Sequence, residues 1–190
     1  MKKIKLPKPK TLLYPMPAVI VGSLVREKAN FCTIAYCGIV HMDPPMISIE
    51  CSENHLTTEG ILEHEEFSVN IPSTDMAEIT DYIGLNSGRD VDKSNLFDVF
   101  FGDLKNAPLI KEAPVNHACK LVKIVELAGS KELFIGEIQS SFVSDGGLSN
   151  DAPDVEKVNP LIYATSNKSY YSIGKEIGKA WNIGKGFKKG

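Results

Sequence analysis

The fold is decided by residues 18–37, which read AVIVGSLVREKANFCTIAYC. Two runs rich in Val, Ile, Phe and Thr, residues 18–25 and 30–37, flank a polar break, which is the pattern of two strands joined by a turn. Four further runs share this character, at residues 46–51, 67–71, 117–127 and 133–143. Several short strands predict a mainly β protein, either a sandwich or a barrel.

A few helices are expected between these strands. Thr57 or Thr58 would cap the first helix, which ends near Glu66 and turns Ile61 and Leu62 inward. A third, amphipathic piece is expected at residues 95–101. The mainly β class is unchanged by these additions.

The second expected helix has the clearest start signal. Asp75 and Glu78 stand three residues apart, as in a capping box. Its apolar side would carry Ile79 and Ile83 together with Tyr82. Gly84 is expected to stop the helix, because glycine is favoured just past a helix end.

Composition indicates one soluble globular domain over residues 1–190. The chain is 43% hydrophobic and 24% charged, without low-complexity bias. Its net charge of −3 hides Lys-rich termini, residues 1–11 and 179–190, around an acidic body. A nucleic-acid binder needs a basic stripe on its folded face, so this class is excluded.

The cysteines and the apolar stretches point to the cytoplasm. Four Cys without a C-x-x-C spacing are expected to be free thiols, typical of a reducing compartment. The apolar stretch of residues 15–25 contains Pro15 and Pro17 and is far shorter than the ~20 residues of a membrane span. No membrane association is therefore expected.

Two polar segments are candidate anion sites. Residues 52–58, SENHLTT, leave a strand and enter a helix, whose unpaired N–H groups suit a phosphate. Residues 87–93, SGRDVDK, combine a tight turn with one of only two arginines in the chain. Spacing alone favours simple helix capping for the first segment and a solvated charged loop for the second, and it leaves the anion-site interpretation of both open.

Other catalytic and binding patterns are missing or incomplete. The sequence contains no G-x-G-x-x-G, no phosphate loop ending in G-K-[ST], no G-x-S-x-G and no H-E-x-x-H. His117 and Cys119 share one face of a strand, but two ligands do not make a metal site, and a buried pair is the simpler interpretation. His41 and His64 are expected at the surface. We expect no metal.

Taken in chain order, these segments resemble the flavin reductase-like, FMN-binding split-barrel family, and within it the flavoredoxin type. The resemblance covers roughly residues 12–178. Its most specific element is the run SGRDVDK. The other matching segments are YPMP (14–17), NFCTIA (30–35), PPM (44–46), Thr57 with Ile61, FSVNIP (67–72), APVN (113–116), CK (119–120), LFIGE (133–137), PLIY (160–163) and YYSIG (170–174).

The resemblance implies a Greek-key split barrel that works as a homodimer, with FMN as cofactor and no catalytic side chain of its own. Residues beside the isoalloxazine would be Asn30, Phe31, Cys32 and Thr33. Its polar edge would be lined by the backbone of Glu50, Cys51 and Ser52. Residues holding the phosphate would be His55, Thr57, Ser87, Gly88, Arg89 and Lys93. Two positions depart from the family pattern, His55 for a basic residue and Ser94 for a Phe.

The implied function is an oxidoreductase that passes electrons through FMN. The donor would be NAD(P)H or a redox protein, and the acceptor free flavin, a ferric complex or a partner protein. The residues leave one alternative open, a non-catalytic module of the same fold that holds flavin or heme. Pyridoxamine phosphate oxidation is a further alternative, although its basic substrate motif is missing.

Overall fold

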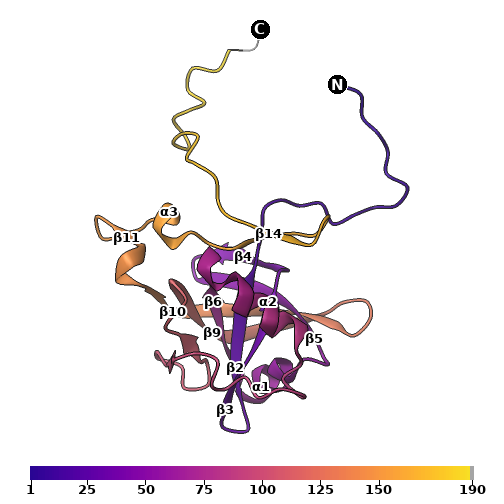
Figure 1. The fold of residues 1–190 in the computed structure, drawn as a ribbon, viewed down its shortest axis with the longest axis vertical. Helices are drawn as coiled ribbons and strands as arrows, with labels where there is room; N and C mark the ends of the chain where they lie inside the picture. Colours follow the sequence, from indigo (N-terminus) through magenta and orange to yellow (C-terminus); the bar gives the residue numbers. More distant parts are fainter. Residues whose placement is uncertain (189–190) are drawn as a thin grey trace.

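The computed structural model describes residues 1–188, so residues 189–190 of the expected Lys-rich terminus lie outside the described part. Seven antiparallel strands form the main sheet in the order β3-β2-β6-β9-β10-β5-β4 (Figure 1). In chain order they are β2 (Val19–Val25), β3 (Lys28–Ile34), β4 (Cys37–Met42), β5 (Pro45–Ser52), β6 (Glu66–Ile71), β9 (Val115–Glu126) and β10 (Lys131–Val143).

All six predicted strands are present, with one correction. Residues 30–37 do not form one strand, because β3 ends at Ile34 and Cys37 begins β4. Five of the six residues of β4 are exposed. Its apolar side chains therefore do not alternate between core and solvent, and the period-2 signal that identifies a half-buried strand is absent.

The main sheet curls around one core. Six of its seven strands contribute side chains to a single apolar cluster, in which Val21, Ile49, Phe67 and Phe134 are fully buried. Burial of each such side chain stabilises the fold by about 1.5–3 kcal/mol. Cys32 of β3 and Cys51 of β5 belong to the same cluster, so the two strands face each other across the barrel although they are not paired in the sheet.

Helix α1 (Leu56–His64) begins one residue before the expected caps. His55 is the N-cap, and Thr57 and Thr58 lie buried inside the first turn. The helix ends at Glu65, which is in the left-handed conformation. Ile61 is buried as expected, but Leu62 is 48% exposed. The expectation for Leu62 is wrong because the buried side of α1 consists of Thr57, Thr58, Gly60 and Ile61.

Helix α2 (Ala77–Leu85) lacks the predicted capping box. Asp75 lies in a preceding 3₁₀ turn, η1 (Thr74–Met76), and neither helix start has a side-chain cap. Gly84 does not end the helix, which continues to Leu85. Ile83 is buried as predicted.

The expected helix at residues 95–101 is absent. Instead β7 (Val99–Phe100) pairs with β8 (Leu109–Ile110). Phe97 packs edge-on against Phe31 with ring centroids 5.4 Å apart, so tertiary packing decides this segment's conformation. The short helix α3 (Val155–Val158) was not predicted. Asp154 caps it by accepting hydrogen bonds from the backbone N–H groups of Glu156 and Lys157.

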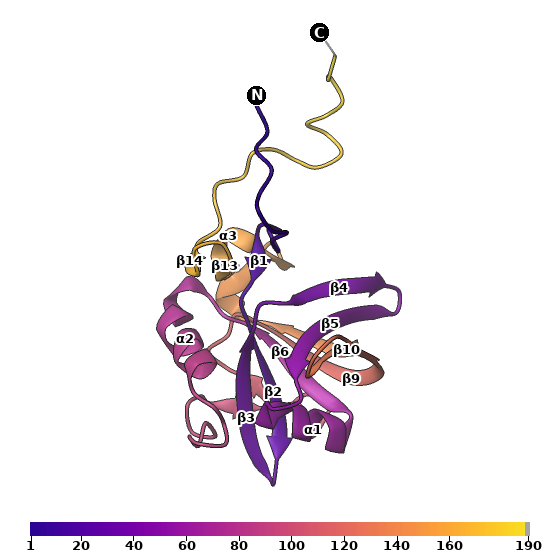
Figure 2. The same cartoon turned by 90° about the vertical axis from the view of Figure 1, so that its right-hand side faces the viewer.

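Two segments distant in sequence meet at one end of the barrel. In a three-stranded sheet, β1 (Met16–Pro17) pairs with β13 (Ile162–Ala164), which pairs with β14 (Ser169–Tyr171). A hairpin, β11 (Leu148–Ser149) with β12 (Ala152–Pro153), and the 3₁₀ turn η2 (Asp145–Gly147) precede it. Both terminal segments leave the body at this end (Figures 1 and 2). Within residues 1–188, none of the helices combines the length and apolar character needed to span a bilayer.

Candidate functional site

Two adjoining cavities lie where β3, α1 and α2 meet. The larger has a volume of about 900 Å³ and the smaller about 230 Å³. Four residues line both: Thr33, His55, Gly84 and Leu85. A long ligand can therefore extend from one cavity into the other.

The wall of the larger cavity combines aliphatic and aromatic side chains, which a flat ring system requires, with charged and hydroxyl-bearing ones. The aliphatic and aromatic side chains include Leu12, Ile34, Tyr36 and Tyr163. The N-terminal segment forms part of this wall and is held in place by Thr165 Oγ1, which donates to the Thr11 carbonyl at 3.0 Å.

Two pairs of polar side chains lie in the larger cavity's wall. Lys131 Nζ is 3.3 Å from Glu50 Oε1. Tyr170 donates its hydroxyl proton to Asp81 Oδ1 at 3.0 Å. Burial and, after it, the Asp81 carboxylate raise the pKa of Tyr170 to about 12. The tyrosine therefore keeps its proton at neutral pH.

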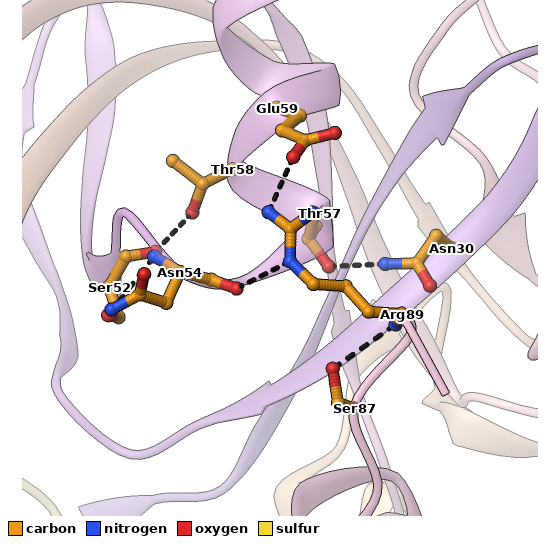
Figure 3. Close-up of polar contacts among 8 residues, drawn as sticks. All are labelled: Asn30, Ser52, Asn54, Thr57, Thr58, Glu59, Ser87 and Arg89. Atoms are coloured by element: carbon orange, nitrogen blue, oxygen red, sulfur yellow. Dashed lines mark hydrogen bonds and ion pairs between the residues drawn. The ribbon is translucent and has the colours of Figure 1, made fainter. Parts of the chain in front are cut away.

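The smaller cavity opens on the N-terminus of α1. Asn30, 5% exposed, places its amide against Thr57 (Figure 3), with 2.8 Å to Thr57 Oγ1. With its oxygen turned toward the helix, the amide also accepts from the Thr57 backbone N–H at 3.2 Å. Asn30 thus supplies the cap that the N-cap residue His55 does not. The buried His55 Nδ1 has no hydrogen-bond partner among the residues described.

The loop of residues 87–93 lies directly against this helix start. A Cβ on Gly88 would come within 2.2 Å of the Asn30 amide, so any other residue there would push this buried side chain out of place. Arg89 reaches across to α1, donating from Nε to the Asn54 carbonyl at 3.2 Å and pairing with Glu59 (Figure 3). Its guanidinium thus ties the loop to α1 instead of facing the cavity.

Lys93 is buried in the wall of the smaller cavity, at 3% exposed. Its ammonium donates to the carbonyls of Phe31 at 2.9 Å and Ile83 at 3.0 Å. One of its three N–H groups remains for a ligand. Burial lowers the pKa of Lys93.

Two thiols lie close together at the smaller cavity, Cys32 in its wall and Cys51 outside it. The sulfurs of Cys32 and Cys51 and a ring nitrogen of His55 all lie within 4.8 Å of one another. The neighbouring Cys51 thiol and, to a lesser extent, the His55 ring beside it hold the pKa of Cys32 well below its usual value, against the effect of burial. The same contact and burial raise the pKa of Cys51 well above its usual value. The thiols of Cys37 and Cys119 have pKa values raised by burial.

Most of the predicted site residues come together around these cavities. The smaller cavity is lined by Asn30, Phe31, Cys32, Thr33, His55, Thr57, Ser87, Gly88 and Lys93, and the larger by Thr33, Glu50 and His55. Cys51, Ser52 and Arg89 line neither. His117 also lines neither cavity. Its Nδ1 lies 2.8 Å from Ser141 Oγ.

Sequence reasoning missed several residues in the walls. Gly84 and Leu85, at the end of α2, line both cavities, and Tyr36, Asp81, Lys131 and Tyr170 line the larger. Lys131 could have been found, because β10 pairs with β5 and sets it opposite Ser52. No local signal marks Asp81 or Tyr170, since their contact joins residues 89 positions apart.

The chain is similar to known flavin proteins over nearly its whole length. The family model of the flavin reductase like domain matches residues 11–173. A flavoredoxin from Methanosarcina acetivorans superposes with a TM-score of 0.92 at 39% identity, covering 97% of this chain and 98% of that one. The flavoredoxin of Desulfovibrio vulgaris gives 0.89 at 33% identity, covering 96% and 100%. An uncharacterized protein of Archaeoglobus fulgidus is 30% identical, covering 86% of this chain and 92% of its own length. The mainly β split-barrel fold is thus confirmed.

Proposed function

The chain belongs to the flavin reductase like family, and from that premise we propose that it is an oxidoreductase with FMN as its cofactor, built as one domain. The observation that carries this proposal is the two-part cavity, in which a small part at a helix start adjoins a large part that has aliphatic and aromatic side chains in its wall. These two parts match the phosphate and the ring system of FMN.

The smaller cavity has the donors that a phosphate needs. The N-terminus of α1 carries partial positive charge and N–H groups without intrahelical partners. Thr57 adds a hydroxyl, whose proton would turn from the Asn30 oxygen to the phosphate, and Lys93 adds its remaining N–H. His55, the N-cap residue of α1, lines the same cavity. Ser87 and Gly88 bring the loop backbone close, while Arg89 holds that loop against α1.

The larger cavity would receive the isoalloxazine. Of the residues expected beside the ring, Thr33 lines this cavity, whereas Asn30, Phe31 and Cys32 line the smaller one. Tyr36 and Tyr163 offer aromatic surface. Glu50 and Lys131 supply opposite charges at the polar edge, where Cys51 and Ser52 continue the strand. When bound, FMN supplies the hydride and electron transfer, so the protein's part is to bind the ring, orient it and limit access of water.

A titration with FMN and riboflavin tests the phosphate assignment. Two lost hydrogen bonds to a charged group, at ~1.5–3 kcal/mol each, weaken riboflavin binding by at least about 100-fold relative to FMN. Calorimetry of the full chain measures both affinities. Equal affinities would show that the smaller cavity is not a phosphate site.

Electron donor and acceptor define the activity. We propose that NAD(P)H or a reduced redox protein delivers the electrons, and that free flavin, a ferric complex or a partner protein takes them. Stopped-flow absorbance of the FMN-loaded protein mixed with NADH or with NADPH measures the first step. Rapid bleaching identifies a reductase, whereas no bleaching with either nucleotide, or with a reduced ferredoxin-type donor, would identify a non-catalytic binding module.

We also propose that the protein works as a homodimer. The terminal segments carry large apolar side chains in water, among them Leu13 at 77% and Trp181 at 95% exposed, and β4 adds Met42 at 88%. Such surface is typical of an interface, and we expect more than ~1,000 Å² to be buried. Sedimentation velocity should give twice the mass of the chain at micromolar concentration. A species of single-chain mass would contradict the proposal.

A further inference from the structure

Cys32, Cys51 and His55 form a cluster, and each comes from a different segment of the chain. Cys32 comes from β3, Cys51 from β5, and His55 from the loop that enters α1. One ligand atom of each lies within 4.8 Å of the other two. Among residues 1–188, no other three His, Cys, Asp or Glu side chains are grouped in this way.

The cluster contains unused hydrogen-bonding capacity. His55 Nδ1 is buried without a partner in the described part of the chain. Leaving such a nitrogen unpaired costs about 1–3 kcal/mol. His55 does not cap its own helix, because the Asn30 amide contacts the Thr57 N–H instead. The imidazole is therefore free to bind something else.

Two thiolates and a neutral imidazole are the donors that Zn²⁺ prefers. The two negative charges would balance the cation, so the complex is neutral and suits the apolar core to which Cys32 and Cys51 belong. Cys32 and His55 also line the smaller cavity, so water can supply a fourth ligand from that side. We propose that Cys32, Cys51 and His55 form a binding site for a soft divalent cation of the Zn²⁺ type.

Binding changes protonation but involves no electron transfer. Each thiol gives its proton to solvent as its sulfur binds the cation, so two protons leave when both thiols start protonated. Lys93 interacts electrostatically with Cys32, and Lys131 with Cys51. Lys131 is paired with Glu50, and Lys93 donates to two carbonyls, so neither occupies the cluster.

Cobalt(II) is a direct spectroscopic probe of this site. The full chain, reduced and stripped of metal, is titrated with Co²⁺ without oxygen. We expect one equivalent to bind with an intense thiolate-to-cobalt charge-transfer band, and Zn²⁺ to abolish that band by displacement. Cys51→Ser and Cys32→Ser should lose the band. His55→Gln should weaken Zn²⁺ binding by at least about 100-fold, the upper end of what losing a group that merely supports a ligand costs.

Cys37→Ser and Cys119→Ser are the matched controls, because both remove a thiol outside the cluster and should keep the band. Circular dichroism melting verifies that every variant is folded, and His55→Gln tests the site even if a core Cys variant fails this check. The proposal is overturned if the reduced wild-type chain shows no band, if the band survives in Cys51→Ser, or if Cys119→Ser loses it equally. A reduced chain that binds no Co²⁺ but forms a Cys32–Cys51 disulfide with mild oxidant would identify a redox pair instead.

Discussion

Two buried polar clusters in this protein differ in how completely their hydrogen-bonding capacity is used. The Asn70 amide, in the barrel, uses all of it. Its nitrogen donates to the Ile20 carbonyl and to Ser68 Oγ, and its oxygen accepts from the Ile110 N–H and from Asn116 Nδ2, all at 2.9–3.0 Å. At the start of α1, by contrast, His55 Nδ1 has no partner among the described residues.

This difference separates a structural cluster from a binding site. Satisfied polar groups in a low-dielectric interior fix neighbouring strands and loops in one arrangement. Unsatisfied ones cost stability, and one that belongs to a cavity wall, as His55 does, is open to a ligand. Substitution at Asn70 should therefore change folding, whereas substitution at the start of α1 should change binding.

The largest effect is expected from Asn70→Ala. It leaves the Ile20 carbonyl and the Ile110 N–H unpaired, and each buried orphan costs about 1–3 kcal/mol. We expect the free energy of unfolding to fall by at least ~3 kcal/mol in urea titrations, while the folded fraction binds FMN normally. Asn95→Ala, at an exposed asparagine, is the control and should change stability by under ~0.5 kcal/mol. Equal losses of unfolding free energy in Asn70→Ala and Asn95→Ala would show that the buried hydrogen bonds of Asn70 do not stabilise the fold.

Thr57→Ala should give the opposite pattern. Losing one hydrogen bond to a charged phosphate weakens FMN binding by about tenfold to a hundredfold and leaves riboflavin binding nearly unchanged. Calorimetric titration with both ligands measures this. Thr58→Ala is a matched control, because Thr58 Oγ1 donates to the Ser52 carbonyl and lines neither cavity. If Thr57→Ala weakens the binding of FMN and of riboflavin alike, Thr57 stabilises the start of α1 and does not bind the phosphate.

Glu59→Gln tests whether Arg89 is a tether or a phosphate ligand. The Arg89–Glu59 pair is about half exposed, so it contributes roughly 0–1 kcal/mol. We expect stability to fall by less than ~1 kcal/mol and FMN binding to tighten about two- to fivefold, because the freed guanidinium can turn toward the phosphate. Glu63→Gln, on the same helix, is the control. FMN binding weakened more than about tenfold would show that the tether itself shapes the site.

The smallest effect is expected from Asp81→Asn. The pKa of Tyr170 is about 12, and removing the carboxylate should lower it toward its usual value of ~10. Because the folded state holds this proton more tightly, its contribution to stability is present below about pH 10 and is lost as pH rises toward 12. Ultraviolet absorbance titration of tyrosinate follows the shift. An unchanged titration curve would show that burial alone, without the Asp81 carboxylate, raises the pKa of Tyr170.

Sequence predicted the barrel better than it predicted the site. Strands rich in β-branched residues carry a local, periodic signal, and six of the seven strands of the main sheet were predicted. The exception is β4, which lacks this signal. The cap of α1 was assigned to Thr57 or Thr58 because capping is normally local, but the capping amide is Asn30, far away in the chain. Arg89 was placed at the phosphate by the family resemblance, and no sequence pattern shows that Glu59 lies next to it. Contacts between distant segments explain why neither the cap nor the Arg89–Glu59 pair was predicted.

The wall shared by the two cavities makes a spanning ligand bivalent. Once one half of such a ligand is held, the other half is at an effective concentration that can reach millimolar for a short connection. A free phosphate or an isolated ring gains nothing from this, so fragments of the cofactor should compete poorly with the whole. Selectivity then depends on the length of the chain that joins ring to phosphate, because a spacer too short to pass Thr33 and His55 leaves one cavity empty.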